Sequence, residues 1–204
     1  MSVAEPKSFI APPVGAPLVR FTAARYEELT RQGFFGPADK IELIDGYLVE
    51  KMPQNDPHMV LVDLFSEIFF RILPKEWTAR CQLGVRLTSD TIPEPDVTIV
   101  PGPKRRYLRG KPTKKEIALV IEVADSSLRY DRTTKLRIYA RDRLPVYWIV
   151  NIPGRVVEVY TEPKAGRSPV YRKREEFGQG AQVPVVLLGD TVAEISVDEL
   201  FGDF

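Results

Sequence analysis

The chain has 204 residues, enough for one domain with its own hydrophobic core. Its 29 Lys and Arg residues almost balance its 28 Asp and Glu residues, and the formal net charge of +1 excludes an overall basic coat for nucleic acid. No apolar run approaches the roughly 18 residues of a membrane span, so we expect no membrane segment. The one cysteine, Cys81, excludes an internal disulfide and fits a reducing, cytoplasmic location.

The single histidine limits the catalytic chemistry available to the chain. His58 cannot form a zinc site built from several histidines, and a Ser-His-Asp hydrolase would have to use this residue alone. We therefore expect any catalytic chemistry to rest on carboxylates and lysine. Carboxylate oxygens favour Mg²⁺ or Mn²⁺ over softer metals, so a metal-dependent enzyme of this composition would use one of these two ions.

The beginning of the chain is interpreted from its composition and its capping residues. Residues 1–18 are rich in proline and alanine and are expected to form a flexible N-terminal arm before a single domain over residues 19–204. A helix is predicted over residues 23–32, because Thr22 is a favourable N-cap and Gly33 a favourable end.

A hairpin and a long helix are predicted next. Residues 41–44 and 47–50 form two strand-like runs separated by Asp-Gly, a typical two-residue turn. A helix is predicted over residues 56–73, with Asp56 as its N-cap and Pro57 at its first position. Its apolar face is unusually broad, which indicates burial on more than one side or a contact in a homodimer. This face comprises Leu61, Val62, Leu64, Phe65, Ile68, Phe69 and Ile72.

The rest of the chain contains more strands than helices. Strands are predicted over residues 77–88, 96–100, 117–123, 146–150, 155–161 and 169–173, and helices over residues 131–141 and after Ser196. This order favours an α/β or α+β fold in which helices pack on a central mixed sheet, with extra antiparallel strands.

Two acidic residues stand at the ends of apolar, strand-like runs. Glu122 follows the run at residues 117–121, and Asp96 precedes the run at residues 97–100. A buried carboxylate is costly unless a cation or a strong donor meets it. If the two strands are neighbours, both carboxylates meet at one end of the sheet, as the ligands of a divalent ion do. The alternative is that each acid caps a strand or pairs with an arginine.

A lysine and a third acid complete the candidate site. Lys135, on the predicted helix, would orient an attacking water and offset charge on a pentavalent phosphorus if it faces the sheet. Its alternative role is a helical ion pair with Asp131, four residues earlier. Glu42 is either a surface strand residue or a carboxylate that holds a water or a second ion. His58 is either a capped polar residue at a helix start or a donor in the site.

A basic stretch separates the strands that carry Asp96 and Glu122. Because of this position it could overhang the site and bind phosphates, and the alternative is a solvated loop. The stretch contains Lys104, Arg105, Arg106, Tyr107, Arg109, Lys111, Lys114 and Lys115.

Several short segments occur in an order that resembles a known family. They are Glu42-Leu43-Ile44-Asp45-Gly46, Pro95-Asp96-Val97, Ile121-Glu122-Val123, Asp131-x-x-x-Lys135-x-x-x-Tyr139-Ala140 and Pro145-Val146-Tyr147-Trp148-Ile149-Val150. This set, which covers about residues 20 to 160, resembles a large bacterial "putative restriction endonuclease" family of the PD-(D/E)XK nuclease superfamily, long labelled a domain of unknown function.

The resemblance implies a restriction-endonuclease-like fold and a set of site residues. It implies Asp96 and Glu122 as metal ligands, the backbone carbonyl of Val123 as a further ligand, and Glu42 as the early acid of the fold. In the plain superfamily motif the lysine lies two residues after the second acid, where this chain has Ala124. The resemblance implies that Lys135 replaces it from the following helix.

A further departure concerns the loop after Glu122. The sequence Ala124-Asp125-Ser126-Ser127 stands where a Leu-Ser-Pro-Ser-like stretch is usual in the family, so the geometry of this loop is expected to differ.

These observations favour a Mg²⁺- or Mn²⁺-dependent endonuclease that hydrolyses nucleic acid, DNA in the first instance, with Asp96, Glu122, Lys135 and Glu42 as its catalytic group. We expect His58, Arg132 and Tyr139 to contact the substrate. One alternative is a catalytically silent nuclease fold that binds nucleic acid or protein, which the absence of a lysine at position 124 favours. Another is a small-molecule-binding barrel, in which the acids and the lysine would share no purpose.

Overall fold

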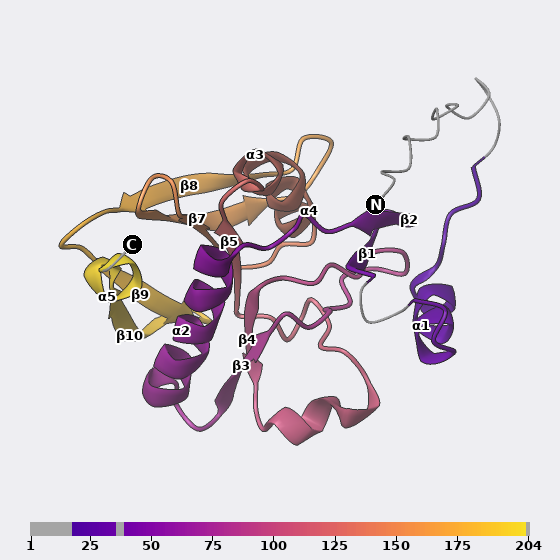
Figure 1. Ribbon diagram of the computed structural model, residues 1–204, viewed down its shortest axis with the longest axis horizontal. Helices are drawn as coiled ribbons and strands as arrows, with labels where there is room; N and C mark the ends of the chain where they lie inside the picture. The colour runs from indigo at the N-terminus through magenta and orange to yellow at the C-terminus, as the bar shows by residue number, and fades with distance from the viewer. Residues whose placement is uncertain (1–17, 36–38, 203–204) are drawn as a thin grey trace, which may run out of the picture.

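The computed structural model describes residues 18–35 and 39–202, and its centre is a six-stranded mixed sheet (Figure 1). The predicted arm over residues 1–18 lies, apart from Leu18, outside the described residues. The strands are ordered β3-β4-β5-β6-β7-β8, and only β5 and β6 run parallel. The predicted α+β architecture with a mixed central sheet is therefore confirmed.

The elements follow one another in this order along the chain. They are α1 (Ala23–Arg31), β1 (Ile41–Ile44), β2 (Tyr47–Glu50), α2 (Asp56–Ile72), β3 (Trp77–Cys81), β4 (Val97–Pro101), the 3-10 helix η1 (Lys104–Arg109), β5 (Leu119–Ala124), α3 (Leu128–Tyr130), the π-helical turn η2 (Asp131–Lys135), α4 (Leu136–Arg141), β6 (Val146–Asn151), β7 (Val156–Lys164), β8 (Val170–Phe177), β9 (Gln182–Leu187), β10 (Asp190–Ser196) and α5 (Val197–Phe201).

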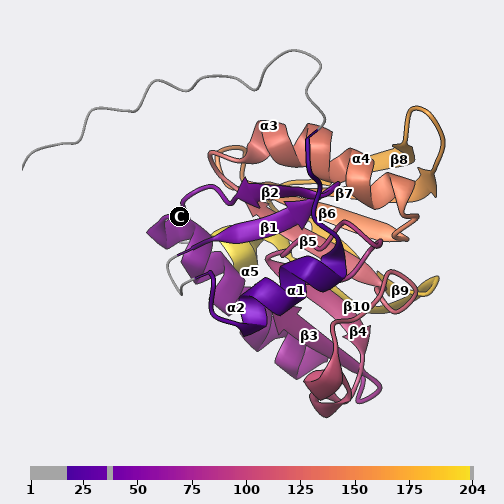
Figure 2. The ribbon, with the colours of Figure 1, turned by 90° about the vertical axis from the view of Figure 1, so that its right-hand side faces the viewer.

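Both faces of the sheet are covered. The long helix α2, the β9–β10 hairpin and α5 lie on one face, on the left in Figure 1. The hairpin β1–β2 and the helical segment α3–η2–α4 lie against the other face, which Figure 2 views with α1, β1 and β2 in front. Because both faces are covered at the centre of the sheet, β5 and β6 consist of buried residues, as their mainly apolar sequences predict.

Side-chain alternation along β5 decides which residues face the site. Ile121 and Val123 pack in the core with α2, whereas Val120 and Ala124 pack in the core with α4. Glu122 therefore points to the side of α4 and the β1–β2 hairpin, at the end of the strand.

The N-terminal predictions are confirmed with one correction. Thr22 caps α1, accepting from the backbone N–H of Arg25, and the β1–β2 turn has positive φ at Asp45 (49°) and Gly46 (78°). The N-cap of α2 is Asn55 instead of Asp56, because the Asn55 side chain accepts from the backbone N–H of His58.

Two strand predictions were inaccurate. The strand predicted over residues 77–88 ends at Cys81; Gln82 adopts φ 51°, and the chain then continues as irregular backbone with only isolated bridges. The strand predicted over residues 169–173 extends to Phe177, and the β9–β10 hairpin was not predicted. The short helix after Ser196 is confirmed as α5.

The broad apolar face of α2 is explained within one chain. Leu61, Phe65 and Phe69 are fully buried in the core formed by the sheet, β9–β10 and α5. This helix is therefore covered from two directions, which was one of the two explanations offered for its sequence. Among the described residues, none of the helices combines the length and the hydropathy that a membrane crossing needs.

Candidate active site

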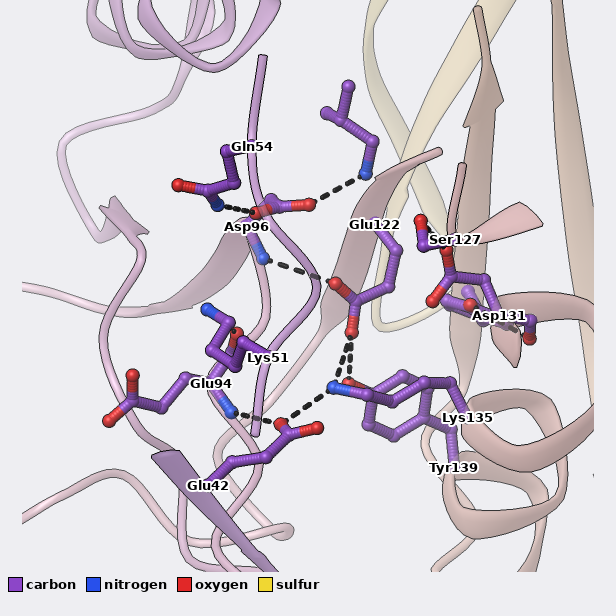
Figure 3. Close-up of polar contacts among 12 residues, drawn as sticks. Glu42, Lys51, Gln54, Glu94, Asp96, Glu122, Ser127, Asp131, Lys135 and Tyr139 are labelled. Atoms are coloured by element: carbon purple, nitrogen blue, oxygen red, sulfur yellow. Dashed lines mark hydrogen bonds and ion pairs between the residues drawn. The ribbon is translucent and has the colours of Figure 1, made fainter. Parts of the chain in front are cut away.

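Asp96 and Glu122 lie at adjacent positions of the antiparallel strands β4 and β5. Val97 pairs with Ile121, so Asp96 enters the sheet beside Glu122. Oδ2 of Asp96 accepts from the backbone N–H of Val123 at 2.9 Å, and the N–H of Asp96 lies 3.4 Å from Oε2 of Glu122 (Figure 3). Both side chains are about 95% buried, with exposures of 4% and 5%. The two acids therefore converge at one place in the sheet, as predicted.

Lys135 reaches the acids from the helical segment that follows β5. Its Nζ lies 2.8 Å from Oε2 of Glu42 and 3.3 Å from Oε1 of Glu122. The alternative helical ion pair with Asp131 is replaced by these contacts, and Asp131 instead accepts from Ser127 Oγ at 2.6 Å. The helix begins at Leu128, earlier than predicted, and Asp131–Lys135 is a π-helical turn, a feature frequent at functional sites.

Glu42 is a buried residue, only 2% exposed, so its interpretation as a surface strand residue is wrong. Besides its ion pair with Lys135, Oε2 of Glu42 accepts from the backbone N–H of Glu94 at 3.1 Å. The backbone carbonyl of Glu94 in turn accepts from Lys51 Nζ at 3.0 Å. Glu42 thus joins the β1 strand, the segment before Asp96 and the lysine.

The charges of this cluster perturb one another. Burial raises the pKa of Glu122, and the attraction of Lys135 opposes this rise only in part. Burial also disfavours the ammonium of Lys135, but Glu122 and Glu42 outweigh it and raise the pKa of Lys135 above its usual range. Lys135 is therefore a fixed cation, and it cannot serve as a proton acceptor at neutral pH.

His58 lies on the other side of Asp96. Its Nε2 lies 3.0 Å from Oδ1 of Asp96, and the amide of Gln54 lies 3.3 Å from the same oxygen. Burial disfavours the imidazolium, but the hydrogen bond and charge of Asp96 outweigh it and raise the pKa of His58. Gln54 is itself held by Gln82, whose Nε2 donates to Oε1 of Gln54 at 3.1 Å. The sequence pattern did not indicate either glutamine.

A cavity of about 310 Å³ opens onto these groups. Its wall includes Asp131. Burial, and to a smaller extent repulsion from Glu122, raises the pKa of Asp131 to about 8. The lining contains six acidic side chains against two lysines and one histidine: Glu42, Glu50, Asp96, Glu122, Asp125 and Asp131 against Lys51, Lys135 and His58. Carboxyl oxygens are hard ligands of the kind that a divalent cation prefers.

Two of the residues expected to contact the substrate do not line this cavity. Tyr139 is fully buried, and its hydroxyl donates to Oε1 of Glu122 at 2.5 Å, so it positions the carboxylate. Arg132 points away from the site and pairs with Glu158 on β7. The π-helical turn thus directs Arg132 toward Glu158 on β7 and Lys135 toward the acids. His58, in contrast, lines the cavity as expected.

The donor set fits one Mg²⁺ or Mn²⁺ ion. Asp96 and Glu122 supply carboxylate oxygens and Val123 also lines the cavity, and Mg²⁺ is commonly held by few protein ligands together with waters. Within residues 18–35 and 39–202, no three His, Cys, Asp or Glu side chains are placed to hold one ion together. The predicted ligand set of two carboxylates, the Val123 carbonyl and waters therefore stays a prediction.

The mixed sheet and the pair of strand-borne acids with a lysine define the restriction-endonuclease-like class. The model of the Uma2 family, described as "Putative restriction endonuclease", matches residues 23–196, and the chain belongs to this family. No curated protein matches it. Among solved structures, the fold is similar to that of a "putative nuclease belonging to DUF820" from Anabaena variabilis, with a TM-score of 0.65 and 18% identity over 89% of this chain and 98% of that chain.

Proposed function

We propose that this protein is a divalent-metal-dependent endonuclease that hydrolyses phosphodiester bonds, with DNA as its substrate. The observation that supports this most strongly is the position of Glu122, between Asp96 on one side and the ammonium of Lys135 on the other, in one cavity. Membership of the Uma2 family supports the same reaction class.

Asp96, Glu122 and the Val123 carbonyl would hold the Mg²⁺ or Mn²⁺ ion. When bound, such an ion acts as a Lewis acid toward a phosphate oxygen and lowers the pKa of a water ligand. The protein fixes the two carboxylates through the backbone: the N–H of Val123 holds Asp96, and the N–H of Asp96 lies against Glu122. Tyr139 fixes the other oxygen of Glu122.

Lys135 supplies the permanent positive charge of the site. Its proton stays on Nζ because two buried carboxylates raise its pKa, so it acts by electrostatics and by hydrogen bonding. The ammonium offsets the negative charge that develops on the phosphoryl oxygens and orients the attacking water. Glu42 positions Lys135 through its Oε2, and because it also lines the cavity we propose that it can hold a water or a second ion.

The catalytically silent alternative predicts a different outcome for metal binding. A calorimetric titration of Mg²⁺ and Mn²⁺ into the wild type and into Glu122→Ala separates the two. The nuclease proposal requires binding that the substitution abolishes. Equal heats for both proteins would favour a silent module.

Cleavage of plasmid DNA in Mg²⁺ tests the activity itself. We expect Asp96→Asn and Lys135→Met each to lower the rate at least about a hundredfold, the scale of removing one charge-stabilising group. The exposed Lys173, which pairs with Glu175 on β8, provides a control: Lys173→Met removes the same charge and should cleave normally. Unchanged activity in both site variants would end the assignment.

Three further expectations belong to this proposal. Residues 19–204 are proposed to form one domain, the protein is proposed to be cytoplasmic, and a homodimer is proposed. Sedimentation of the wild type and of Phe70→Asp tests the dimer, because Phe70 on α2 is 91% exposed. A monomeric wild type contradicts it.

A further inference from the structure

The basic stretch between β4 and β5 does not overhang the active-site cavity. Among the described residues, the lining of that cavity contains none of residues 104–115. η1 lies below β3 and β4, as the pink helix at the foot of Figure 1 shows. Residues 107–111 instead form one wall of a second cavity, so the basic stretch serves a different part of the surface.

This second cavity has a volume of about 480 Å³ and lies between three parts of the chain. Glu27, Thr30 and Arg31 of α1 form one side, and the segment from Tyr107 to Lys111 forms another. The third side is the edge strand β3 and the irregular backbone after it, from Arg80 to Gly84.

Arg80 lines this cavity and forms no ion pair with any carboxylate that the structure describes. Its guanidinium lies over the ring of Tyr107, 4.9 Å from the centroid, and the Tyr107 hydroxyl is fixed by the backbone carbonyl of Pro101 at 2.9 Å. The Nε atom of Arg80 is buried and has no hydrogen-bond partner among the described residues. A buried donor that nothing satisfies is rare and points to a ligand or a water that completes it.

The balance of charge in the cavity is positive. Arg31, Arg80, Arg109 and Lys111 face two acids, Glu27 and Glu94. Glu27 is already shared between Arg86 and Lys111, and Arg31 pairs with Glu28. Within the described part of the chain no carboxylate pairs with Arg80 or Arg109, so two guanidinium groups remain available to an anion.

The two cavities share a wall. Gln82 lines the second cavity and donates to Gln54, which lines the first and also contacts Asp96. Glu94 also lines the second cavity, two residues before Asp96, and its carbonyl accepts from Lys51 of the first. The two cavities are therefore neighbours, linked by the contact between Gln54 and Gln82.

We propose that this second cavity binds a phosphate group through Arg80 and Arg109, and that the group is a backbone phosphate of the nucleic-acid strand that is cleaved. The planar guanidinium matches phosphate oxygens in pairs, which is why arginine suits this role better than lysine. Tyr107 holds Arg80 in place through its ring. The inference rests on the proposed nuclease function.

Binding of DNA, measured apart from cleavage, tests the proposal. Fluorescence anisotropy of a labelled DNA duplex and of one of its strands, in Ca²⁺ over about 50 to 200 mM salt, gives the affinity and its salt dependence. We expect Arg80→Gln and Arg109→Ala each to weaken binding several-fold for every sequence. The slope of log affinity against log salt should fall by about one unit for each lost phosphate contact.

Arg105→Ala is the matched control. Arg105 lies on the same 3-10 helix as Arg109, is exposed, and does not line the cavity, so this variant removes an equal charge. Arg80→Lys keeps the charge but loses the planar fork, and its affinity should fall between those of the wild type and Arg80→Gln. Thermal unfolding of each variant identifies a loss caused by misfolding, in which case Arg109→Ala alone decides.

The outcomes separate this inference from the function on which it rests. If the wild type cleaves DNA but Arg80→Gln and Arg109→Ala bind like Arg105→Ala, the cavity is not a phosphate site and the nuclease assignment stands. If the wild type neither binds nor cleaves DNA, calorimetry with pyrophosphate decides. Pyrophosphate binding that Arg80→Gln abolishes would show that the cavity takes a phosphate group but would overturn its assignment to a nucleic-acid strand, and no binding would overturn both parts of the proposal.

Discussion

The hydroxyl of Tyr139 lies 2.5 Å from Oε1 of Glu122, the same oxygen that faces the ammonium of Lys135. Tyr139 and Lys135 are one helical turn apart, so a single helix presents a neutral donor and a cation to one carboxylate oxygen. The other oxygen of Glu122, Oε2, faces the backbone N–H of Asp96. The orientation of the acid is therefore determined by the helix as much as by its own strand.

Tyr139→Phe tests this orientation. Loss of the phenolic donor should lower the affinity for Mg²⁺ or Mn²⁺ and the cleavage rate about 10- to 100-fold, as for other residues that orient metal ligands. Calorimetry and plasmid cleavage measure the two effects. Tyr171→Phe is the control, because its hydroxyl donates to the carbonyl of Leu144 away from the site. Equal effects of both substitutions would show that Tyr139 is only structural.

Removal of Lys135 should also cost stability. In Lys135→Met two buried carboxylates, Glu42 and Glu122, face each other without a cation, and an unpaired buried charge costs about 3–5 kcal/mol. Burial raises the pKa of Glu122, and protonation of this carboxylate relieves part of the cost, so the variant should be less destabilised at pH 5 than at pH 8. Urea unfolding of the wild type and of Lys135→Met at the two pH values measures this loss of stability. A loss that does not depend on pH would contradict this account.

Asp131 should impose a pH dependence on the metal-free protein. Its folded pKa is about 8, whereas an aspartate in an unfolded chain titrates near 3.9. The folded state therefore binds more protons between about pH 4 and pH 8, and the contribution of Asp131 to stability decreases through this range as the pH rises. Asp131→Asn keeps an acceptor for the Ser127 hydroxyl. In urea unfolding with a chelator present, the free energy of unfolding of this variant should decline less steeply with rising pH than that of the wild type. An unchanged slope would exclude Asp131 as its source.

Arg132 should be important for stability and not for catalysis. Glu158 is fully buried and is paired with Arg132 and Arg174, with Tyr160 donating to it at 2.6 Å. Arg132→Met removes one of these partners and should cost about 1–3 kcal/mol of stability. Its KM for DNA should remain that of the wild type. A raised KM with unchanged stability would restore Arg132 as a substrate contact.

The sequence was sufficient to predict the parts of the fold that depend on local chemistry. Thr22, Asp45 and Gly46 are recognisable because capping and turn preferences depend on neighbouring residues only. The meeting of Asp96 and Glu122 was also predictable, because each stands at the end of an apolar strand and such ends adjoin in a sheet.

The missed features depend on contacts between distant residues. Gln54 and Gln82 are 28 positions apart and have no pattern of their own, yet they bond in the structure. The β9–β10 turn uses Leu188 at φ 53°, an unusual residue for a left-handed position, so its sequence is a poor turn indicator. The π-helical turn at Asp131–Lys135 is equally invisible, since it uses residues that an ordinary helix also accepts.

The origin of Lys135 on a helix has a consequence for how relatives of this protein can be found. In a strand-borne motif the spacing between the acid and the lysine is imposed by the strand repeat. Here a loop, Asp125–Ser127, joins β5 to the helix, so insertions in that loop could change the spacing while the ammonium keeps its place. Homologues with other loop lengths are therefore better sought with a three-dimensional template of two carboxylates and an amine than with a fixed-interval sequence pattern.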